Sequence, residues 1–362
     1  MHIGLIIYDS LDTVSGGYVY DRELVAYLRR QGDAVEIISL EWRDYTRRLG
    51  DNLSTALLRR LAGLRLDILL QDELNHPSLF WINRRLRRQV KFPMIAIVHH
   101  LHSSEARPAW QNRFYRWIER LYLSSVDGFI FNSQTTRRAV EEMLPGRRGA
   151  CRPAVVACPA GDRLKPHIQA GEIARRARQP GPLRLIFLGN VIPRKGLHTL
   201  LEALRPIPRQ AWKLEVVGSL EMDRRYARAV HRQAERAGMS ESVTFTGALD
   251  DGQIAARLQA SHVLVVPSSY EGFGIVYLEG MGFGLPAIAS RSGAAGEIIT
   301  HEQDGYLIEP GDAAALAGHL INLASDRQQL VDMSLAARQR YEQHPTWEQT
   351  TQRIRSFLYE QT

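Results

Sequence analysis

The sequence is poor in cysteine and contains no long apolar run. Its two cysteines, Cys151 and Cys158, have neither metal-ligand nor redox-motif spacing, so we expect two free thiols in a reducing compartment. No apolar run approaches the roughly 20 residues that cross a bilayer. No basic segment precedes the first apolar run, which favours a strand over a signal peptide. These absences predict a cytoplasmic protein.

Other missing patterns exclude further classes of protein. The formal net charge of +7 would suit nucleic acid, but no zinc finger, helix-turn-helix or RNP-like motif accompanies it, so we expect no nucleic-acid partner. No G-x-G-x-x-G follows the first predicted strand, which disfavours a nicotinamide dehydrogenase. At 362 residues, of which 44% are hydrophobic, the chain is long enough for about two domains.

The most informative stretch runs from residue 263 to 280. Its apolar run at 263–266 predicts a buried strand, a loop with two glycines follows, and a helical pattern begins near Ile275. This arrangement turns backbone N–H groups and the positive end of the helix dipole toward the loop, which Glu271 and Glu279 flank. It suits a diphosphate between hydroxyl-rich groups, as in a nucleotide sugar, although such loops also occur in α/β proteins that bind no phosphate.

The spacing of Glu271 and Glu279, with Gly-Phe-Gly after the first, resembles the E-x7-E signature of the retaining glycosyltransferases of family 4. The resemblance continues through 284–290 and 293–297, although family members usually carry a proline where this chain has Gly296. It implies an α/β fold with two Rossmann-like domains that face each other across a cleft, which is the GT-B arrangement.

The expected domain boundaries follow from composition. Residues from about 160 to 181 are rich in glycine and proline, which is typical of an interdomain linker. The resemblance implies an N-terminal acceptor-binding domain over 1–165, a C-terminal nucleotide-sugar donor domain over 182–345, and a C-terminal helix over 346–362 that crosses back to the first domain.

Two further glycine loops resemble phosphate-binding loops of the family. Gly16-Gly17 begins the first helical pattern and would let the backbone approach a ligand closely; by itself it also fits an ordinary tight turn. Gly189 leads to Arg194-Lys195, where fixed cations would stabilise the charge that a leaving diphosphate gains. A surface turn is the plainer alternative for this second loop.

Three histidines follow a strand predicted at 93–98. His99, His100 and His102 do not form a helical i, i+4 pair, and no Cys or Asp nearby completes a ligand set, so we expect no metal. Their position resembles that of the family's site histidine, which supports the transferred sugar near its reactive carbon. His99 is the better match and His100 is the alternative.

The resemblance also implies a role for each site residue. Glu279 would contact ribose hydroxyls, Glu271 would contact hydroxyls of the donor sugar, and the two cations would neutralise the diphosphate. The implied catalytic set is His99, His100, Glu271, Lys195 and Arg194, and the implied donor-binding set is Gly16, Gly17, Gly189, Arg194, Lys195, Glu271, Gly272, Phe273, Gly274 and Glu279. No protein nucleophile is evident, which fits front-face attack assisted by the leaving phosphate, and no cofactor is expected.

Residues 79–91 are basic and contain no acid. Apolar residues recur among them at helical spacing, and the cations are Arg84, Arg85, Arg87, Arg88 and Lys91. One interpretation is an amphipathic helix that holds the protein peripherally on an anionic inner membrane face through 84–91. The other is a solvated basic face on a helix packed against the sheet, which the residues alone favour.

The resemblance therefore implies a retaining hexosyltransferase that uses a nucleoside diphosphate sugar and a glycan, lipid-linked or small-molecule acceptor. A nucleotide-sugar epimerase or a sugar-phosphate synthase of the same fold is one alternative. A catalytically silent partner subunit is another, and it predicts weak nucleotide binding or none. Residue spacing names neither the sugar, the base nor the acceptor.

Overall fold

The computed structural model describes residues 1–13, 15–105, 107–144 and 152–362. Within this part the chain divides into two compact units. Unit 1 consists of Met1–Pro159 with Trp347–Thr362, and unit 2 consists of Ala160–Thr346. Cys158 is partly buried, whereas Cys151 lies outside the described residues.

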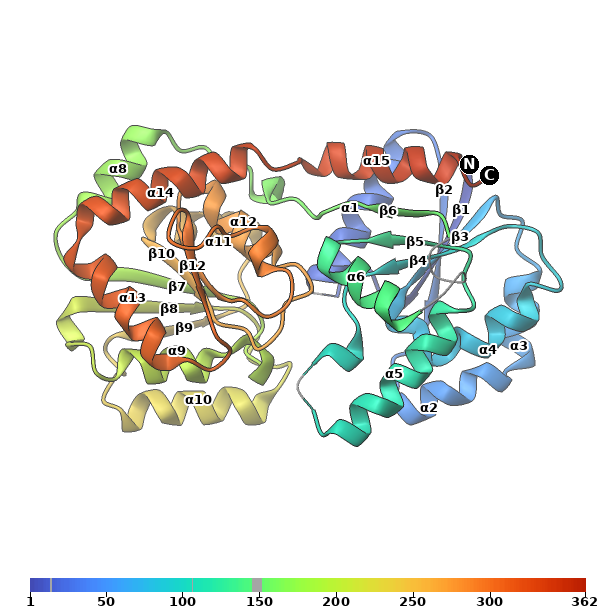
Figure 1. The fold of residues 1–362 in the computed structure, drawn as a ribbon, viewed down its shortest axis with the longest axis horizontal. Coiled ribbons are helices and arrows are strands. Elements are labelled where there is room, and N and C mark those ends of the chain that lie inside the picture. The colour runs from blue at the N-terminus through green and yellow to red at the C-terminus, as the bar shows by residue number, and fades with distance from the viewer. Residues whose placement is uncertain (14, 106, 145–151) are drawn as a thin grey trace. The chain divides into compact units, whose positions relative to one another are not determined.

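Unit 1 is built on one parallel six-stranded sheet in the order β2-β1-β3-β4-β5-β6 (Figure 1). The strands β3 and β4 are buried along their whole length, as expected where helices cover both faces of a parallel sheet. The strands are β1 (His2–Tyr8), β2 (Ala34–Leu40), β3 (Ile68–Asp72), β4 (Met94–Val98), β5 (Gly128–Phe131) and β6 (Ala154–Val156). The helices are α1 (Gly16–Arg30), α2 (Tyr45–Leu49), α3 (Thr55–Ala62), α4 (His76–Leu86), α5 (Ala109–Leu123), α6 (Gln134–Met143) and α15 (Trp347–Tyr359).

The helix α15 belongs to unit 1 although it comes last in the chain. It packs beside α1, where the ring centroids of Tyr20 and Trp347 lie 5.7 Å apart. The carboxylate of Asp33 accepts hydrogen bonds from the amino group of Met1 at 2.8 Å and from Arg355 Nε at 2.7 Å. These partners outweigh the effect of burial and lower the pKa of Asp33. Both chain ends are therefore fixed to one carboxylate, beside each other in Figure 1.

Unit 2 has a second parallel six-stranded sheet, in the order β12-β11-β10-β7-β8-β9. Counted within the unit, this is the 6-5-4-1-2-3 order of a Rossmann fold, whose switch point lies between β7 and β10. The strands are β7 (Leu183–Leu188), β8 (Trp212–Val217), β9 (Val243–Gly247), β10 (Val263–Val266), β11 (Ala287–Ser290) and β12 (Gly305–Ile308). The helices are α8 (Ala170–Arg178), α9 (Leu197–Leu204), α10 (Arg224–Arg236), α11 (Asp251–Ala260), α12 (Ile275–Gly282), α13 (Ala313–Ser325) and α14 (Arg327–Glu342).

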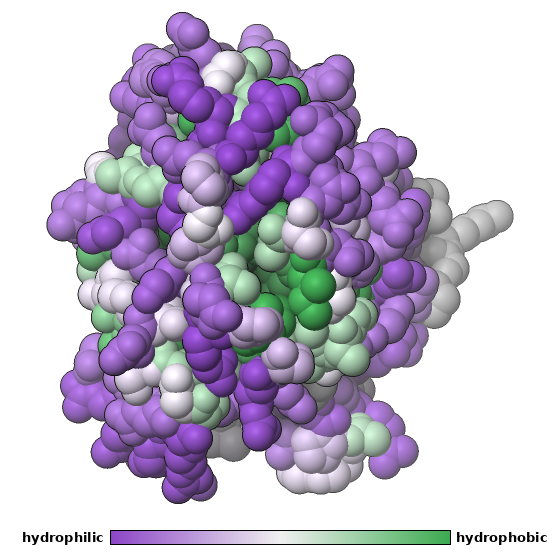
Figure 2. All heavy atoms as spheres, turned by 90° about the vertical axis from the view of Figure 1, so that its left-hand side faces the viewer, coloured by the Kyte–Doolittle hydropathy of each residue, from purple (hydrophilic) through white to green (hydrophobic). Residues whose placement is uncertain are grey.

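Hydrophilic side chains cover most of the face shown in Figure 2, around a smaller hydrophobic area. Among the helices that the structure describes, none combines the length and the apolar character that crossing a bilayer would require.

The interpretation of residues 160–181 as a loose linker is wrong. This segment begins unit 2 and contains α8, whose start is fixed by a capping box between Gln169 and Glu172. Arg176 is buried and donates hydrogen bonds to the carbonyl oxygens of Phe283 and Gly284 at 2.8 and 2.9 Å. Gly171 lies in the first turn of α8, and the prolines and the other glycines of the stretch flank the helix.

One expected helix boundary also differs. The basic helix predicted to extend to residue 91 ends at Leu86, so Arg87 and Arg88 follow it in a turn and Lys91 lies beyond that turn. The helix α11 begins with a capping box, in which Asp250 accepts from Gln253 N while the Gln253 side chain accepts from Asp250 N.

Candidate active site

Two loops meet at the switch point of the sheet in unit 2. One follows β7 and carries Lys195, and the other follows β10 and carries Glu271. Because β7 and β10 are parallel neighbours, both loops leave the same edge of the sheet. Ser269 N donates a hydrogen bond to Arg194 O at 2.8 Å. Arg194 and Ser269 are 75 residues apart in the sequence, but the backbones of their two loops are in contact.

Glycines allow this close approach. Gly196 has a φ of +72°, and a Cβ there would lie 2.1 Å from Pro267 O. Gly293, with a φ of +86°, bridges to Glu271 in the same way, and a Cβ there would lie 2.0 Å from Glu271 O. No side chain fits either gap, so Gly196 lets the backbone approach Pro267 closely and Gly293 lets it approach Glu271.

The carboxylate of Glu271 is buried among cations and a hydroxyl. Its Oε1 accepts from Lys195 Nζ at 2.5 Å and from Ser268 Oγ at 2.6 Å, and Arg194 Nη1 lies 3.6 Å from Oε2. Burial alone would raise the pKa of Glu271, but the charges of Lys195 and Arg194 outweigh it and lower the pKa to about 2. Glu271 is therefore a fixed anion at neutral pH. Burial lowers the pKa of Lys195, and Glu271 opposes this effect.

The start of α12 supplies backbone donors next to this carboxylate. Gly274 occupies the N-cap with a φ of +101° and provides no side-chain acceptor, so the first N–H groups of the helix have no side-chain cap. Tyr277 fixes the helix to the sheet by donating its hydroxyl to Val266 O at 2.9 Å. The positive helix end and the cations thus lie at the same loop, which can bind an anion.

Glu279 is held by a residue that the sequence analysis missed. Arg163, in the short 3-10 turn Asp162–Leu164, donates to Glu279 Oε1 from Nη2 at 2.8 Å and from Nε at 3.1 Å, and it also pairs with Asp251. Burial raises the pKa of Glu279, and Arg163 opposes this effect. Arg163 lay in the stretch interpreted as a linker, and no local pattern connects it to a glutamate 116 positions away.

In unit 1, the structure places His99 next to the Gly16-Gly17 loop. A Cβ on Gly17 would lie 3.1 Å from His99 Cδ2. The His99 side chain is mostly buried, and its Nε2 lies 3.4 Å from Asp21 Oδ1. His100 instead pairs with Glu105, with 2.9 Å between Nε2 and Oε1. Of the two histidines considered, His99 is the one beside the glycine loop.

Acids that are remote in sequence surround this histidine. One cluster has polar atoms within 4.8 Å of one another and consists of Asp21, Asp72 and His99. A second, separate cluster meets the same criterion and consists of Glu73, His76 and Glu119. All six residues are buried. The sequence shows no Cys or Asp near these histidines, because Asp21 comes from α1 and Asp72 from the end of β3.

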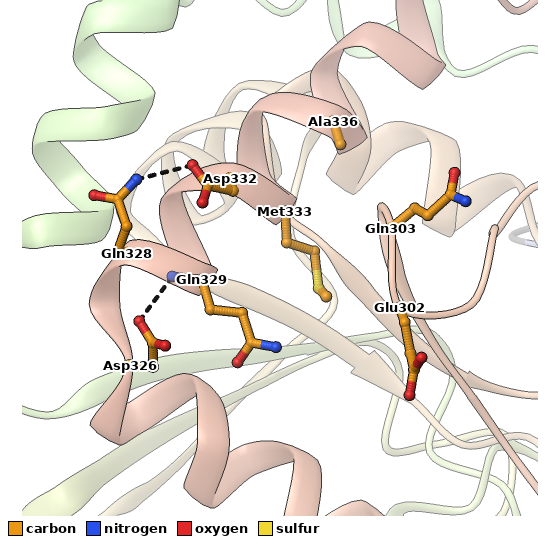
Figure 3. A pocket seen from close by; sticks show the side chains of 8 residues that line it. All are labelled: Glu302, Gln303, Asp326, Gln328, Gln329, Asp332, Met333 and Ala336. Atoms are coloured by element: carbon orange, nitrogen blue, oxygen red, sulfur yellow. Dashed lines mark hydrogen bonds between the residues drawn. The ribbon is translucent and has the colours of Figure 1, made fainter.

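A hollow of about 540 Å³ lies elsewhere in unit 2 (Figure 3). Its lining residues are Glu302, Gln303, Asp326, Gln328, Gln329, Asp332, Met333 and Ala336. Most come from the start of α14, where Gln328 Nε2 donates to Asp332 at 2.8 Å. None of them belongs to the loop that carries Glu271, so this hollow is separate from the site described above.

Comparison with known proteins identifies the family. The model of glycosyl transferases group 1 matches residues 171–340, and that of the glycosyl transferase 4-like domain matches residues 15–159. The GDP-mannose-dependent alpha-(1-6)-phosphatidylinositol monomannoside mannosyltransferase of Mycobacterium tuberculosis is 29% identical over 54% of this chain and 53% of its own length. Glycogen synthase of the same species is 31% identical over 48% of this chain and 42% of its own length. The chain thus spans about half the length of the curated relatives it matches.

Solved structures share the fold. Sucrose-phosphate synthase of Thermosynechococcus elongatus superimposes with a TM-score of 0.83 at 22% identity, covering 99% of this chain and 98% of that one. HepE of Anabaena in complex with UDP superimposes with a TM-score of 0.76 at 19% identity, covering 99% and 100%. The expected GT-B fold with two Rossmann-like domains is confirmed, and the chain belongs to the group 1 glycosyltransferases, family 4.

Proposed function

We propose that this protein is a retaining hexosyltransferase that moves a hexose from a nucleoside diphosphate sugar to an acceptor. The observation that carries the proposal is the buried carboxylate of Glu271 between Lys195 and Arg194, next to the uncapped start of α12. Cations and helix N–H groups stabilise the charge of a leaving diphosphate, and a buried anion accepts hydrogen bonds from sugar hydroxyls.

The other residues have complementary roles in this proposal. Glu279, oriented by Arg163, accepts hydrogen bonds from the ribose hydroxyls. His99, beside Gly17, supports the sugar near its reacting carbon. Unit 1 carries the acceptor and unit 2 the donor. Relatives in three species are GDP-mannose-dependent by name, and HepE of Anabaena was solved with UDP, so both bases belong in the test.

The test is release of nucleoside diphosphate from a panel of UDP-, GDP- and ADP-sugars. We expect one donor to be hydrolysed slowly by the wild type, and hydrolysis to be lost in Glu271→Ala. Glu309→Gln, which changes an exposed glutamate in the same unit, is the matched control and keeps wild-type activity. Epimerised sugar without acceptor would indicate an epimerase, and absence of binding at millimolar donor would indicate a silent partner subunit. Either result contradicts the proposal.

We also propose that unit 1 contacts an anionic membrane surface through residues 84–91. In this segment Arg84, Arg88 and Lys91 are exposed, while Leu86 is buried in the core. Trp81, one turn before them on α4, is 49% exposed. Exposed cations beside a partly exposed tryptophan suit a surface of anionic headgroups.

Sedimentation with vesicles tests this contact. Wild-type protein is expected to bind vesicles that contain anionic phospholipid and not vesicles of phosphatidylcholine alone, and the double variant Arg84→Glu/Arg88→Glu is expected to lose binding. Arg224→Glu/Arg228→Glu on α10, an exposed pair in unit 2, is the matched control. Equal binding by both double variants would contradict the assignment to 84–91.

A further inference from the structure

Three buried side chains lie at the carboxyl edge of the sheet in unit 1, namely those of Asp21, Asp72 and His99. Asp72 is the last residue of β3 and faces Ile97 of β4, so His99, which follows β4, emerges beside it. Asp21 reaches the same point from α1. The His99 Nε2 is 3.4 Å from Asp21 Oδ1, and polar atoms of all three side chains lie within 4.8 Å of one another.

These groups have few partners other than one another. In the described part of the chain, neither carboxylate oxygen of Asp21 has a hydrogen-bond partner, and the same holds for Asp72 Oδ2 and His99 Nε2. Asp21 and Asp72 are fully buried. An isolated buried carboxylate costs several kcal/mol unless a nearby positive charge compensates it, and the positive charge that the geometry offers Asp21 is the imidazolium form of His99.

We propose that Asp21 is a positioning residue that fixes the ring of His99 beside Gly17 and keeps this ring an imidazolium at neutral pH. The role of His99 in sugar transfer rests on the proposed function, whereas the pairing of Asp21 with His99 does not. With Nε2 facing Asp21, Nδ1 is the ring nitrogen that does not face this carboxylate.

The charges that face His99 from the neighbouring elements agree with this assignment. They are Asp21 from α1, Asp72 from β3 and Glu73 from the turn after it; burial lowers the pKa of His99, but these three acids outweigh burial and raise it to about 9. Burial raises the pKa of Asp72 well above its usual range, and the charge of Asp21 adds to this effect. Asp21, whose Oδ1 lies 3.4 Å from His99 Nε2, is therefore the acid that the geometry assigns to the ring.

Contacts with uncharged groups hold the ring and its backbone in place. Tyr20 presents its ring edge-on to His99, with the centroids 5.2 Å apart. Asn132 donates from Nδ2 to the His99 carbonyl at 2.7 Å. With the backbone fixed by Asn132 and one ring side filled by Tyr20, the position of Asp21 determines where Nε2 points.

The test is an NMR pH titration of the His99 ring, with its signals assigned through His99→Gln. In the wild type His99 is expected to titrate near pH 9, and in Asp21→Asn its midpoint is expected to fall by roughly 1–3 pH units. Asp72→Asn is expected to shift the midpoint much less, because burial raises the pKa of Asp72 and favours its uncharged form. Glu36→Gln, which removes an exposed charge from β2, is the control for net charge and leaves the midpoint unchanged.

Three results would overturn the proposal. They are a wild-type midpoint near the ordinary value of 6.5 for histidine, an equal shift in Asp72→Asn and Asp21→Asn, and a divalent metal ion retained at one equivalent per chain by mass spectrometry. If Asp21→Asn does not fold, the wild-type midpoint and the small effect of Asp72→Asn still decide the question.

The titration requires no donor, so its outcome is independent of the proposed function. If a donor is found, kcat of Asp21→Asn is expected to decline at a lower pH than in the wild type, by the same number of pH units as the NMR shift. A residue with a merely structural role would reduce activity without moving the pH profile.

Discussion

Glu271 in unit 2 and Asp21 in unit 1 are both buried carboxylates near glycine loops, but different kinds of cation compensate them. Glu271 pairs with Lys195 and Arg194 and also accepts from Ser268. Asp21 pairs with His99 and has no hydrogen-bond partner among the described residues. A lysine and an arginine remain charged around neutral pH, whereas a histidine is charged only because its surroundings keep it so. We therefore expect the charges around Glu271 to stay constant near neutral pH and the charge of His99 to change with pH.

The largest expected effect is that of Lys195→Met, which removes the cation closest to Glu271. The Glu271 carboxylate would stay buried with Arg194 3.6 Å away, and we expect a loss of about 4 kcal/mol in the free energy of unfolding at pH 7. Urea unfolding measures it. The double variant Lys195→Met/Glu271→Gln should recover more than half of the loss; if it is no more stable than the single variant, the buried charge is not the cause.

The next effect concerns the pH-sensitive pair. A folded-state pKa of about 9 for His99, against an ordinary 6.5, corresponds to about 3 kcal/mol. The native state holds this proton more tightly than the unfolded chain, so the stabilisation is fully present below pH 6.5 and is lost as the pH rises through about 9. We expect thermal unfolding to show this fall in wild type and most of it to be absent in Asp21→Asn. Parallel curves for both proteins between pH 6 and 10 would contradict the pairing.

The smallest effect concerns binding. Arg163→Met would remove both hydrogen bonds to Glu279 Oε1, and we expect donor KM to rise roughly tenfold with a smaller change in kcat. Arg291→Met breaks an exposed ion pair with Glu309 and serves as the control. A steady-state assay with the donor found in the panel measures the change. Equal KM values for both variants would show that Arg163 does not orient Glu279 for the ribose.

The same contrast explains what the sequence could predict. A local pattern predicts the loop that carries Glu271, together with the strand before it and the helix after it. The structure has this strand, β10, and this helix, α12, at the predicted positions. The hydrogen bonds from Arg163 to Glu279 and the 3.4 Å contact between Asp21 and His99 join residues far apart in the chain, and only the strand order brings them together. Local composition misled the analysis at α8, where glycine and proline on both sides hid a nine-residue helix.

The central claim is that Glu271 accepts hydrogen bonds from the donor sugar while Lys195 and Arg194 hold its diphosphate. Calorimetric titration of wild type and Glu271→Gln tests it most directly, with the nucleoside diphosphate alone and with the complete nucleotide sugar. We predict that both proteins bind the nucleoside diphosphate with similar affinity and that the variant loses the additional affinity which the sugar provides. If the variant instead loses affinity for the nucleoside diphosphate and keeps the additional affinity that the sugar provides, the role assigned to Glu271 is wrong.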